Sequence, residues 1–224
     1  MRKWLKVVLL IVIVFGVSNE LHHYAAPKTS IEMLDDAMQS VVEVLHSNYP
    51  NQPASGSYIG DGIILTAKHV SIHEEVDKVR FEDGTECKVI GRYNHPDIDV
   101  GLLFIEKIDK PILKFDNKKL YRGTVIYVLG SPMGQIFNCS KGIVSNTTRE
   151  PRVELHGNIE LIQVDAYSCP GSSGSAVIDE DGEIRAILVG GTHTPCGGPI
   201  IGSGVCISTE HILKVIEDYN AFQK

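Results

Sequence analysis

The stretch AVIDEDGEIRAILV, residues 176–189, contains two apolar segments on either side of an Asp-Gly pair. Asp-Gly between two hydrophobic segments indicates a β-hairpin, because both residues tolerate the positive φ angles of a tight turn. The same arrangement occurs around Asp83-Gly84, with apolar segments at residues 79–81 and 87–90. These two stretches predict antiparallel β-structure.

Further short apolar segments, many of them rich in β-branched residues, are separated by polar turns. They are residues 41–45, 62–66, 100–105, 124–129, 143–144, 153–155, 159–164 and 205–207. Many short strands at regular spacing predict an all-β barrel or sandwich. Helical spacing is expected over residues 31–39 and in a closing helix capped by Ser208 or Thr209. The apolar face of that closing helix consists of Ile212, Val215, Ile216 and Tyr219.

The chain has 224 residues, of which 43% are hydrophobic and 22% charged. These are ordinary values for a globular protein. Without its N-terminal segment the chain keeps roughly 190 residues, enough for one large all-β domain or two small fused barrels. The formal net charge of -7 argues against a nucleic-acid partner, because binding to phosphates requires a clustered basic surface.

The N-terminus has the pattern of a targeting segment. Arg2, Lys3 and Lys6 precede an uncharged, almost wholly apolar run over residues 7–17. This run is shorter than the ~20 residues of a membrane span and suits the core of a signal peptide. We expect residues 1–26 to be a signal peptide, or an uncleaved membrane anchor, followed by a tether. Either reading predicts an exported chain, periplasmic or extracellular, that contacts a membrane only through this segment.

Ser173 lies in a segment rich in glycine and serine, residues 169–176. A serine hydroxyl becomes a nucleophile when a base accepts its proton and hydrogen-bond donors bind the oxyanion that forms. Neighbouring glycines let backbone N–H groups turn toward such an oxyanion without a Cβ in the way. The N–H groups of Gly171 and Ser173 are the candidate donors. Taken alone, the segment is more typical of an ordinary loop, because turns rich in glycine and serine are common.

His69 and Asp99 are the candidate partners of Ser173. His69 follows the apolar segment that ends at Thr66, and Asp99 directly precedes the apolar segment 100–105. A carboxylate in that position is largely desolvated and requires a donor. An imidazole N–H is a suitable donor, and the contact fixes the tautomer that a general base needs. Asp97 is the competing carboxylate, and each residue alone has an ordinary structural interpretation.

The three segments together resemble the motifs of trypsin-like proteases. They are Leu65-Thr66-Ala67-Lys68-His69-Val70, Asp97-Ile98-Asp99-Val100-Gly101-Leu102-Leu103 and Gly171-Ser172-Ser173-Gly174-Ser175-Ala176. The chain order His, Asp, Ser is that of chymotrypsin and not of subtilisin or the α/β-hydrolases. Within this class the chain is most similar to the bacterial HtrA protease domain, through residues 128–134, 140–145, 162–166 and 202–207. The resemblance covers about residues 33 to 218.

The resemblance implies an all-β fold of two six-stranded antiparallel β-barrels with a C-terminal helix, over residues 27–224. It implies a serine endopeptidase in which His69 and Asp99 come from the first barrel. Ser173 and the oxyanion donors Gly171 and Ser173 come from the second. Peptide hydrolysis then proceeds through an acyl-enzyme and uses no metal or cofactor. HtrA proteins also carry a PDZ domain, which we do not expect here because the chain ends after the closing helix.

The same resemblance implies protein or peptide substrates. It puts Tyr167 at the base of the S1 pocket and pairs Val189, Gly190 and Gly191 with the substrate backbone as an added strand. Small or medium apolar P1 residues are expected. Leu188 stands where glutamyl endopeptidases carry a histidine, which argues against glutamate specificity. HtrA-type domains often form trimers, so a homotrimer is expected by analogy.

The chain has five cysteines, so at least one thiol is unpaired, and their spacing fits no zinc motif. Many chymotrypsin-like enzymes bridge the cysteine that lies four residues before the nucleophile to a loop beside S1. By this analogy Cys169 pairs with Cys196, with Cys206 as the second choice. Buried free thiols are the alternative.

Three other functions compete with this hypothesis. The first is a catalytically silent double barrel that binds peptides, which a misaligned oxyanion site would favour. The second is an esterase-like hydrolase, although the chain lacks a Gly-x-Ser-x-Gly elbow and alternating β and α elements. The third is a cysteine protease that uses Cys169, which lies outside the glycine-flanked turn.

Overall fold

The computed structural model describes residues 29–49, 51–149, 158–193 and 199–223. Three predictions lie outside these residues: the N-terminal signal peptide or anchor, the strand at 153–155, and Cys196. In the described part of the chain, no helix has the length and apolar character needed to cross a membrane.

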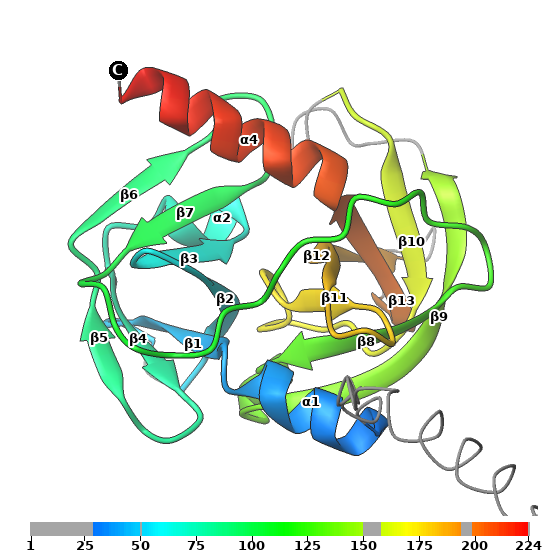
Figure 1. Ribbon diagram of the computed structural model, residues 1–224, viewed down its shortest axis with the longest axis horizontal. Helices are drawn as coiled ribbons and strands as arrows, with labels where there is room; N and C mark the ends of the chain where they lie inside the picture. Colours follow the sequence, from blue (N-terminus) through cyan, green and yellow to red (C-terminus); the bar gives the residue numbers. More distant parts are fainter. Residues whose placement is uncertain (1–28, 50, 150–157, 194–198, 224) are drawn as a thin grey trace, which may run out of the picture.

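The first half of the chain forms one antiparallel sheet of seven strands, in the order β5-β4-β1-β2-β3-β7-β6 (Figure 1). Its strands are β1 (Val41–His46), β2 (Ala54–Gly60), β3 (Ile63–Thr66), β4 (Val76–Phe81), β5 (Glu86–Lys88), β6 (Gly91–Asn94) and β7 (Gly101–Phe104). The predicted hairpin at Asp83-Gly84 is confirmed as the β4–β5 connection.

The second half forms a closed six-stranded barrel in the order β10-β13-β12-β11-β8-β9. Its strands are β8 (Val125–Gly130), β9 (Asn138–Arg149), β10 (Leu161–Asp165), β11 (Ala176–Ile178), β12 (Ile184–His193) and β13 (Pro199–Ser208). The predicted hairpin at Asp181-Gly182 joins β11 to β12. The fold class is therefore confirmed as mostly β, with two barrel-like sheets and a C-terminal helix.

The first sheet differs from the expected six-stranded barrel in its strand count. Only Val89 and Ile90 separate its two edge strands, β5 and β6. The Val89 N–H donates to Asp77 O at 2.8 Å, and the Ile90 N–H donates to Phe104 O at 2.7 Å. The sheet is thus half a barrel whose edges meet through a continuous bend in the chain, and not through a ladder of hydrogen bonds.

Helices cover the ends of the two sheets. They are α1 (Ser30–Met38), the one-turn α2 (Lys68–Ser71), the 3-10 turn η1 (Pro132–Gly134) and α4 (Thr209–Phe222). Helix α1 begins with the capping box of Thr29 and Glu32, whose side chains each bond the other's backbone N–H. Ser208 is the N-cap of α4, as expected, but its side chain makes no capping bond.

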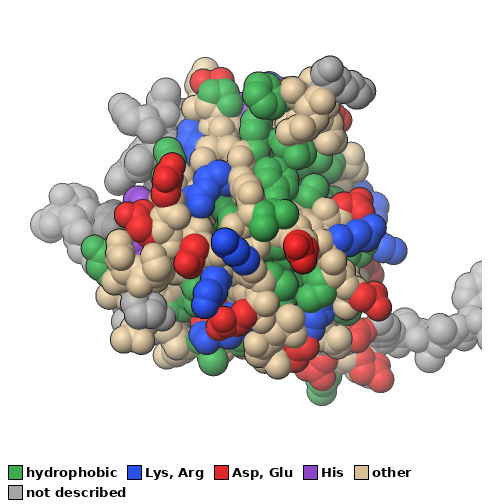
Figure 2. Space-filling model, turned by 90° about the vertical axis from the view of Figure 1, so that its left-hand side faces the viewer, with side chains coloured by type: hydrophobic (Ala, Val, Ile, Leu, Met, Phe, Trp, Pro, Cys, Tyr) green, Lys and Arg blue, Asp and Glu red, His purple; other side chains and the backbone are tan. Residues whose placement is uncertain are grey.

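Helix α4 connects the two sheets, as Figure 1 shows where it runs from β13 across to β6 and β7. Ile212 and Val215 are fully buried against the core. The Tyr219 ring lies 5.0 Å from that of Phe104 and 5.3 Å from that of Tyr93. Figure 2 shows the outer face of the first sheet, where charges of both signs surround a band of hydrophobic side chains.

Candidate active site

His69 lies in the one-turn helix α2, directly after strand β3. Sequence reasoning placed it at a strand edge, and the structure refines this because the chain turns into a helix at Ala67. The first N–H groups of a helix have no partner inside it. Asp99 supplies one, since its Oδ1 accepts the His69 N–H at 2.9 Å. The backbone of His69 is therefore fixed by the carboxylate that also holds its ring.

Asp99 is buried just before β7, with only 3% of its side chain exposed. Its Oδ2 lies 2.8 Å from His69 Nδ1. Helix α2 packs so closely on β7 that a Cβ at Gly101 would lie 1.9 Å from Ser71 Oγ. Glycine at position 101 thus permits the approach that brings the carboxylate to the imidazole.

The other ring nitrogen of His69 faces Ser173, with Nε2 2.8 Å from Oγ. A carboxylate at Nδ1 selects the tautomer with hydrogen on that atom, which leaves the Nε2 lone pair for the serine hydroxyl. The His69 side chain is 44% exposed. The structure thus brings the three predicted residues into one chain of hydrogen bonds that opens to solvent at Ser173.

Asp97, the competing carboxylate, does not take part. It is exposed, and its N–H donates to His95 Nδ1 at 3.1 Å. His95 Nε2 in turn lies 3.2 Å from Asp218 Oδ2 of α4. This arrangement holds the segment before β7 against the C-terminal helix.

The loop that carries Ser173 requires glycine on both sides. Gly171 and Gly174 have φ angles of 93° and 87°, a region that is costly for residues with a Cβ. The Ser172 N–H donates to Cys169 O at 3.0 Å, and the Gly174 N–H donates to Leu188 O at 2.7 Å. Among the described residues, the N–H groups of Gly171 and Ser173 have no acceptor.

Ser55 of β2 is a contact that sequence reasoning missed. Its Oγ donates to Gly171 O and accepts from the Ser131 N–H, both at 2.8 Å. Its N–H donates to Ser173 O at 2.9 Å. No motif marks this residue in the sequence, because its role arises from the contact between the two sheets.

A cleft of about 610 Å³ adjoins His69 and Ser173. It lies where the first sheet and the second barrel meet. Its lining consists of Val44, His46, Asn51, Gln52, Pro53, Ala54, His69, Val70, His73, Val76, Gly134, Pro170, Gly171 and Ser173. None of the residues expected to bind substrate, Tyr167 and Val189 to Gly191, lines this cleft.

Val189, Gly190 and Gly191 belong to β12, and Tyr167 lies between β10 and the nucleophile loop. The Val189 side chain is 4% exposed and belongs to the core. Gly190 O accepts from Ser168 Oγ at 3.2 Å, and a Cβ at Gly190 would meet no atom within 4 Å. Tyr167 is half-buried, and the charge of the neighbouring Cys169, together with a hydrogen bond to it, raises the pKa of the Tyr167 phenol.

Within the described part of the chain, no disulfide joins any two of Cys87, Cys139, Cys169 and Cys206. A bridge from Cys169 to Cys206 is therefore wrong, because Cys206 is buried inside the second barrel, where burial raises the pKa of its thiol. Cys169 Sγ lies 3.8 Å from Ser172 Oγ. Its pairing with Cys196 stays a prediction, since Cys196 is outside the described residues.

The fold and this site define a chymotrypsin-like protein with two barrel-like sheets and a His–Asp–Ser hydrogen-bond chain between them. Residues 54–187 match the family described as trypsin-like peptidase domain. This match covers more than half of the chain, so the chain belongs to that family.

Individual relatives are HtrA-type proteases. The chain is 34% identical over 160 residues to a probable periplasmic serine endoprotease DegP-like of Marinomonas sp. (strain MWYL1), covering 70% of this chain and 33% of that protein. It is 29% identical over 187 residues to a serine protease HtrA-like of Staphylococcus epidermidis, covering 71% and 32%. The chain thus spans about a third of these curated relatives.

Solved structures agree with these sequence matches. The HtrA-type protease AlgW with tripeptide superimposes with a TM-score of 0.72 at 25% identity, over 85% of this chain and 63% of that one. The serine endoprotease from Yersinia pestis gives a TM-score of 0.68 at 25% identity, over 86% and 67%. The resemblance to HtrA-type protease domains is confirmed.

Proposed function

We propose that this chain is a serine endopeptidase in which Asp99, His69 and Ser173 form the catalytic triad. The observation that carries the proposal is the pair of 2.8 Å contacts, from Asp99 Oδ2 to His69 Nδ1 and from His69 Nε2 to Ser173 Oγ. Together these contacts give the nucleophile a base and give the base an orienting carboxylate.

The proposed reaction has two halves. His69 Nε2 accepts the Ser173 proton while Oγ bonds to the scissile carbonyl carbon, and His69 then gives that proton to the leaving amine as the C–N bond breaks. A water molecule then loses a proton to His69 as its oxygen bonds to the acyl carbon, and His69 gives that proton to Ser173 Oγ as the ester C–O bond breaks and the acid is released. In both halves the N–H groups of Gly171 and Ser173 bind the oxyanion, a role supported by their lack of any other acceptor among the described residues.

Proteins or peptides are the proposed substrates. An extended peptide would add to β12 at Val189 to Gly191, and the open space beside Gly190 supports this. Tyr167 would form the base of S1, with small or medium apolar P1 residues. The Leu188 side chain is 1% exposed, which leaves no polar group there for a P1 glutamate.

The relatives extend the proposal to location and assembly. One of them is a periplasmic enzyme by name, and we propose that this chain is exported, with residues 1–26 as signal peptide or anchor and 27–224 as the protease domain. A homotrimer is proposed from the family analogy alone. Membrane contact is proposed only through the N-terminal segment, and no nucleic acid is involved.

The decisive experiment is labelling of the purified chain with a fluorophosphonate probe, which reacts with activated serines. We expect the wild type to be labelled and Ser173→Ala to remain unlabelled. Prior treatment with N-ethylmaleimide should not reduce the labelling, because Ser173 and not Cys169 is the nucleophile. An unlabelled wild type that still binds peptides would replace this proposal with a silent binding module.

A further inference from the structure

We propose that His46, His73 and Glu75 form a zinc-binding site on the wall of the cleft beside Ser173. The proposed catalytic steps use no metal. Zinc at this site would instead restrict the access of peptides to the cleft beside Ser173. Zinc binding itself is independent of the proposed function. Only its expected effect, slower cleavage of peptides that occupy the cleft, depends on the chain being a protease.

The donor atoms already lie near the positions that zinc requires. One atom from each side chain, among His nitrogens and carboxylate oxygens, lies within 4.8 Å of the other two. His46 Nε2 is 4.0 Å from Glu75 Oε2. Tetrahedral zinc holds nitrogen and oxygen ligands at ~2.0–2.1 Å, hence about 3.4 Å from one another. Each contact must therefore shorten by about 1.4 Å or less, and His73 and Glu75 are exposed and free to turn.

The chemistry of the donor set favours zinc. Two imidazoles and one carboxylate, with water as the fourth ligand, are a known protein set for this ion. Imidazole nitrogen also disfavours Mg²⁺ and Ca²⁺, which prefer oxygen ligands. The predicted ligand is therefore a borderline-soft divalent cation, with zinc as the probe.

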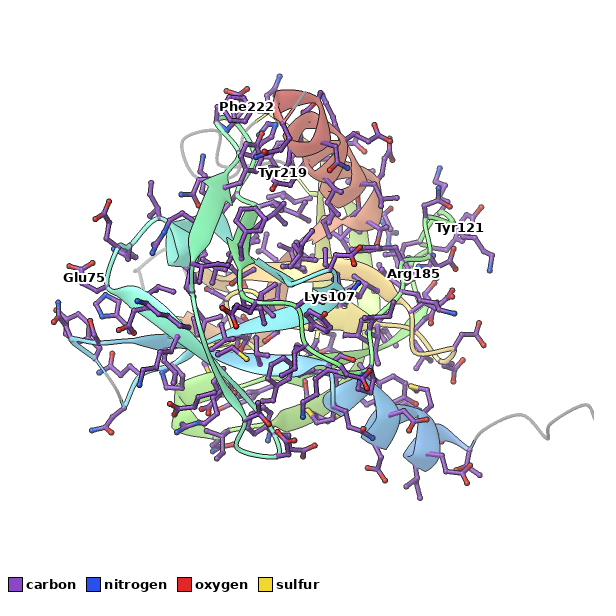
Figure 3. All side chains as sticks on the ribbon, turned by 60° about the vertical axis from the view of Figure 1, so that its left-hand side comes forward. Glu75, Lys107, Tyr121, Arg185, Tyr219 and Phe222 are labelled. Atoms are coloured by element: carbon purple, nitrogen blue, oxygen red, sulfur yellow. The ribbon has the colours of Figure 1, made fainter. Side chains whose placement is uncertain are left out.

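The backbone that carries the three side chains is fixed without a metal. The Ser47 N–H donates to Glu75 O at 2.9 Å, and the Val76 N–H donates to His73 O at 3.1 Å. The guanidinium of Arg92 donates to four carbonyl oxygens of the same segment, those of Ser71, His73, Glu74 and Val76. The site thus joins the end of β1 to the α2–β4 connection on a rigid support, and Figure 3 shows Glu75 at the outer edge of the molecule.

Binding has one identifiable cost. His46 Nδ1 accepts the Asn48 N–H at 3.2 Å, so the neutral ring carries its hydrogen on Nε2. A zinc ion at Nε2 requires that hydrogen to move to Nδ1, which breaks the bond from Asn48. Because Asn48 is exposed, water can take the place of the lost acceptor. The cost is therefore small beside two imidazole–zinc bonds.

The location gives zinc a consequence for function. His46 and His73 line the same cleft as His69 and Ser173, and His73 lies four residues after His69. A zinc ion with its water would fill part of this cleft and link the end of β1 to the α2–β4 connection on the cleft wall formed by the first sheet. Peptides that extend into the cleft should then bind more weakly.

Zinc binding is tested first, by calorimetric titration of full-length Ser173→Ala with zinc chloride. In this background we expect His73→Ala and Glu75→Gln each to weaken binding at the cluster at least tenfold. The matched control, Glu74→Gln, removes an exposed neighbouring carboxylate outside the cluster and should bind as the parent does. Equal affinity in all four proteins, or an equal loss in Glu74→Gln, would overturn the proposal. Zinc should also raise the melting temperature of the parent more than that of His73→Ala.

Inhibition is tested with zinc titrations against cleavage of a long peptide by proteins with Ser173 intact. Half-inhibition of His73→Ala should need at least ten times more zinc than the wild type or Glu74→Gln. If His69 alone bound the ion, all three would be inhibited equally, and the proposed link to the cleft would be wrong. If zinc binds but the probe does not label Ser173, the protease proposal is wrong and the zinc site stands. If the probe labels Ser173 but zinc does not bind, the zinc site is wrong and the protease proposal stands.

Discussion

The hydroxyl of Ser55, in the first sheet, donates a hydrogen bond of 2.8 Å to the carbonyl oxygen of Gly171, in the nucleophile loop of the second barrel. The backbone N–H of Ser55 donates to Ser173 O at 2.9 Å. These two bonds fix the peptide units that follow Gly171 and Ser173. The proposed oxyanion donors, the N–H groups of Gly171 and Ser173, lie in the peptide units directly before these two, so a residue from the opposite half of the fold helps to position them.

Ser55→Ala should lower kcat/KM about tenfold. The substitution leaves the buried Ser131 N–H without its acceptor and Gly171 O without its donor, at a cost of about 1–3 kcal/mol. A loss of about 1.4 kcal/mol from the transition state alone corresponds to a factor of ten. Peptide hydrolysis measures the rate, and thermal unfolding measures the stability.

Ser57→Ala is the control on the same strand. Ser57 is equally buried, yet among the described residues its hydroxyl has no hydrogen-bond partner. Its removal should leave both rate and stability unchanged or slightly improve stability. An equal loss of rate in both variants would show that any substitution in β2 lowers the rate, and that the hydrogen bonds of the Ser55 hydroxyl are not the cause.

Asp99→Asn should lower kcat about 10⁴-fold at neutral pH, because an amide in place of the carboxylate favours the wrong tautomer of the histidine. Asp97→Asn, two residues earlier and exposed, should keep the wild-type rate. Steady-state kinetics of both variants test the assignment. If the effects were reversed, Asp97 would be the triad carboxylate.

The sequence predicted the positions of the three triad candidates because each lies in a local motif at the end of an apolar segment. Strand β2 was missed because its first half, Ala54 to Ser57, is made of small residues with little β preference. Packing explains why small residues occur in this half of β2, since a Cβ at Gly56 would lie 2.8 Å from Ile64 Cγ2. Small residues there serve the contact between strands, and no local pattern records such a contact.

The cleft was missed for the same kind of reason. His46 and His73 lie far apart in the sequence, and nothing in their neighbours sets them apart from the other histidines. They meet because β1 pairs with β4 in a register that puts His46 opposite Val76. Register over long sequence separation depends on the whole sheet, so the cleft wall appears only once the sheet is assembled.

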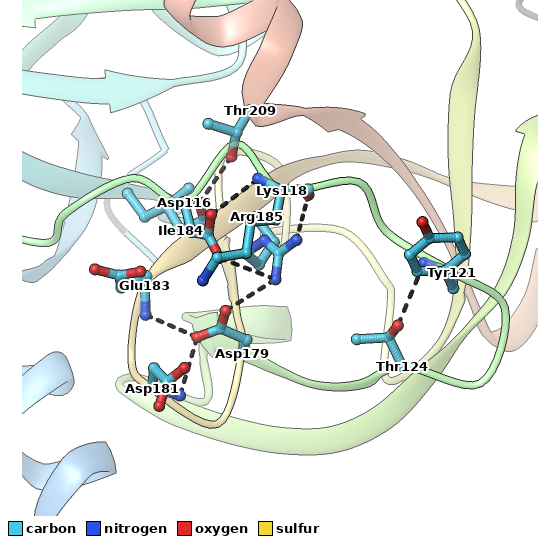
Figure 4. A network of polar contacts seen from close by, with 10 residues as sticks. All are labelled: Asp116, Lys118, Tyr121, Thr124, Asp179, Asp181, Glu183, Ile184, Arg185 and Thr209. Atoms are coloured by element: carbon cyan, nitrogen blue, oxygen red, sulfur yellow. Dashed lines mark hydrogen bonds and ion pairs between the residues drawn. The ribbon is translucent and has the colours of Figure 1, made fainter.

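Asp179→Ala should destabilise the fold by about 3–5 kcal/mol, because it leaves the buried guanidinium of Arg185 without its closest carboxylate. Arg185 Nη1 lies 2.9 Å from Asp179 Oδ2 and 3.5 Å from Asp116 Oδ2 (Figure 4). Both side chains of the closer pair are about nine-tenths buried. Urea unfolding followed by circular dichroism measures the loss.

Lys107→Ala is the matched exposed case. Lys107 Nζ lies 2.7 Å from Asp61 Oδ1, and the two side chains are 75% and 82% exposed; Figure 3 shows Lys107 in the loop after β7. The hydrogen bond from Lys107 lowers the pKa of Asp61, but water and salt screen such pairs. We expect no measurable change in stability, and a loss similar to that of Asp179→Ala would mean that burial does not decide the cost.

Gly174→Ala should abolish probe labelling at Ser173 and destabilise the fold more than Gly84→Ala. Both glycines have φ angles near 85°, at 87° and 84°, so alanine costs about 1–2 kcal/mol at either position. At Gly84 the added Cβ meets no atom within 4 Å, whereas at Gly174 it would lie 2.0 Å from Ser55 O and 2.3 Å from Thr66 Oγ1. The difference between the two variants in urea unfolding thus isolates the effect of the steric contact from that of the backbone strain.

Because Ser55 O accepts the Thr66 hydroxyl at 2.7 Å, the clash at Gly174 can be relieved only by moving the nucleophile loop away from β2. Equal destabilisation with intact labelling would mean that the loop has room to move, and that Ser55 does not hold it in place.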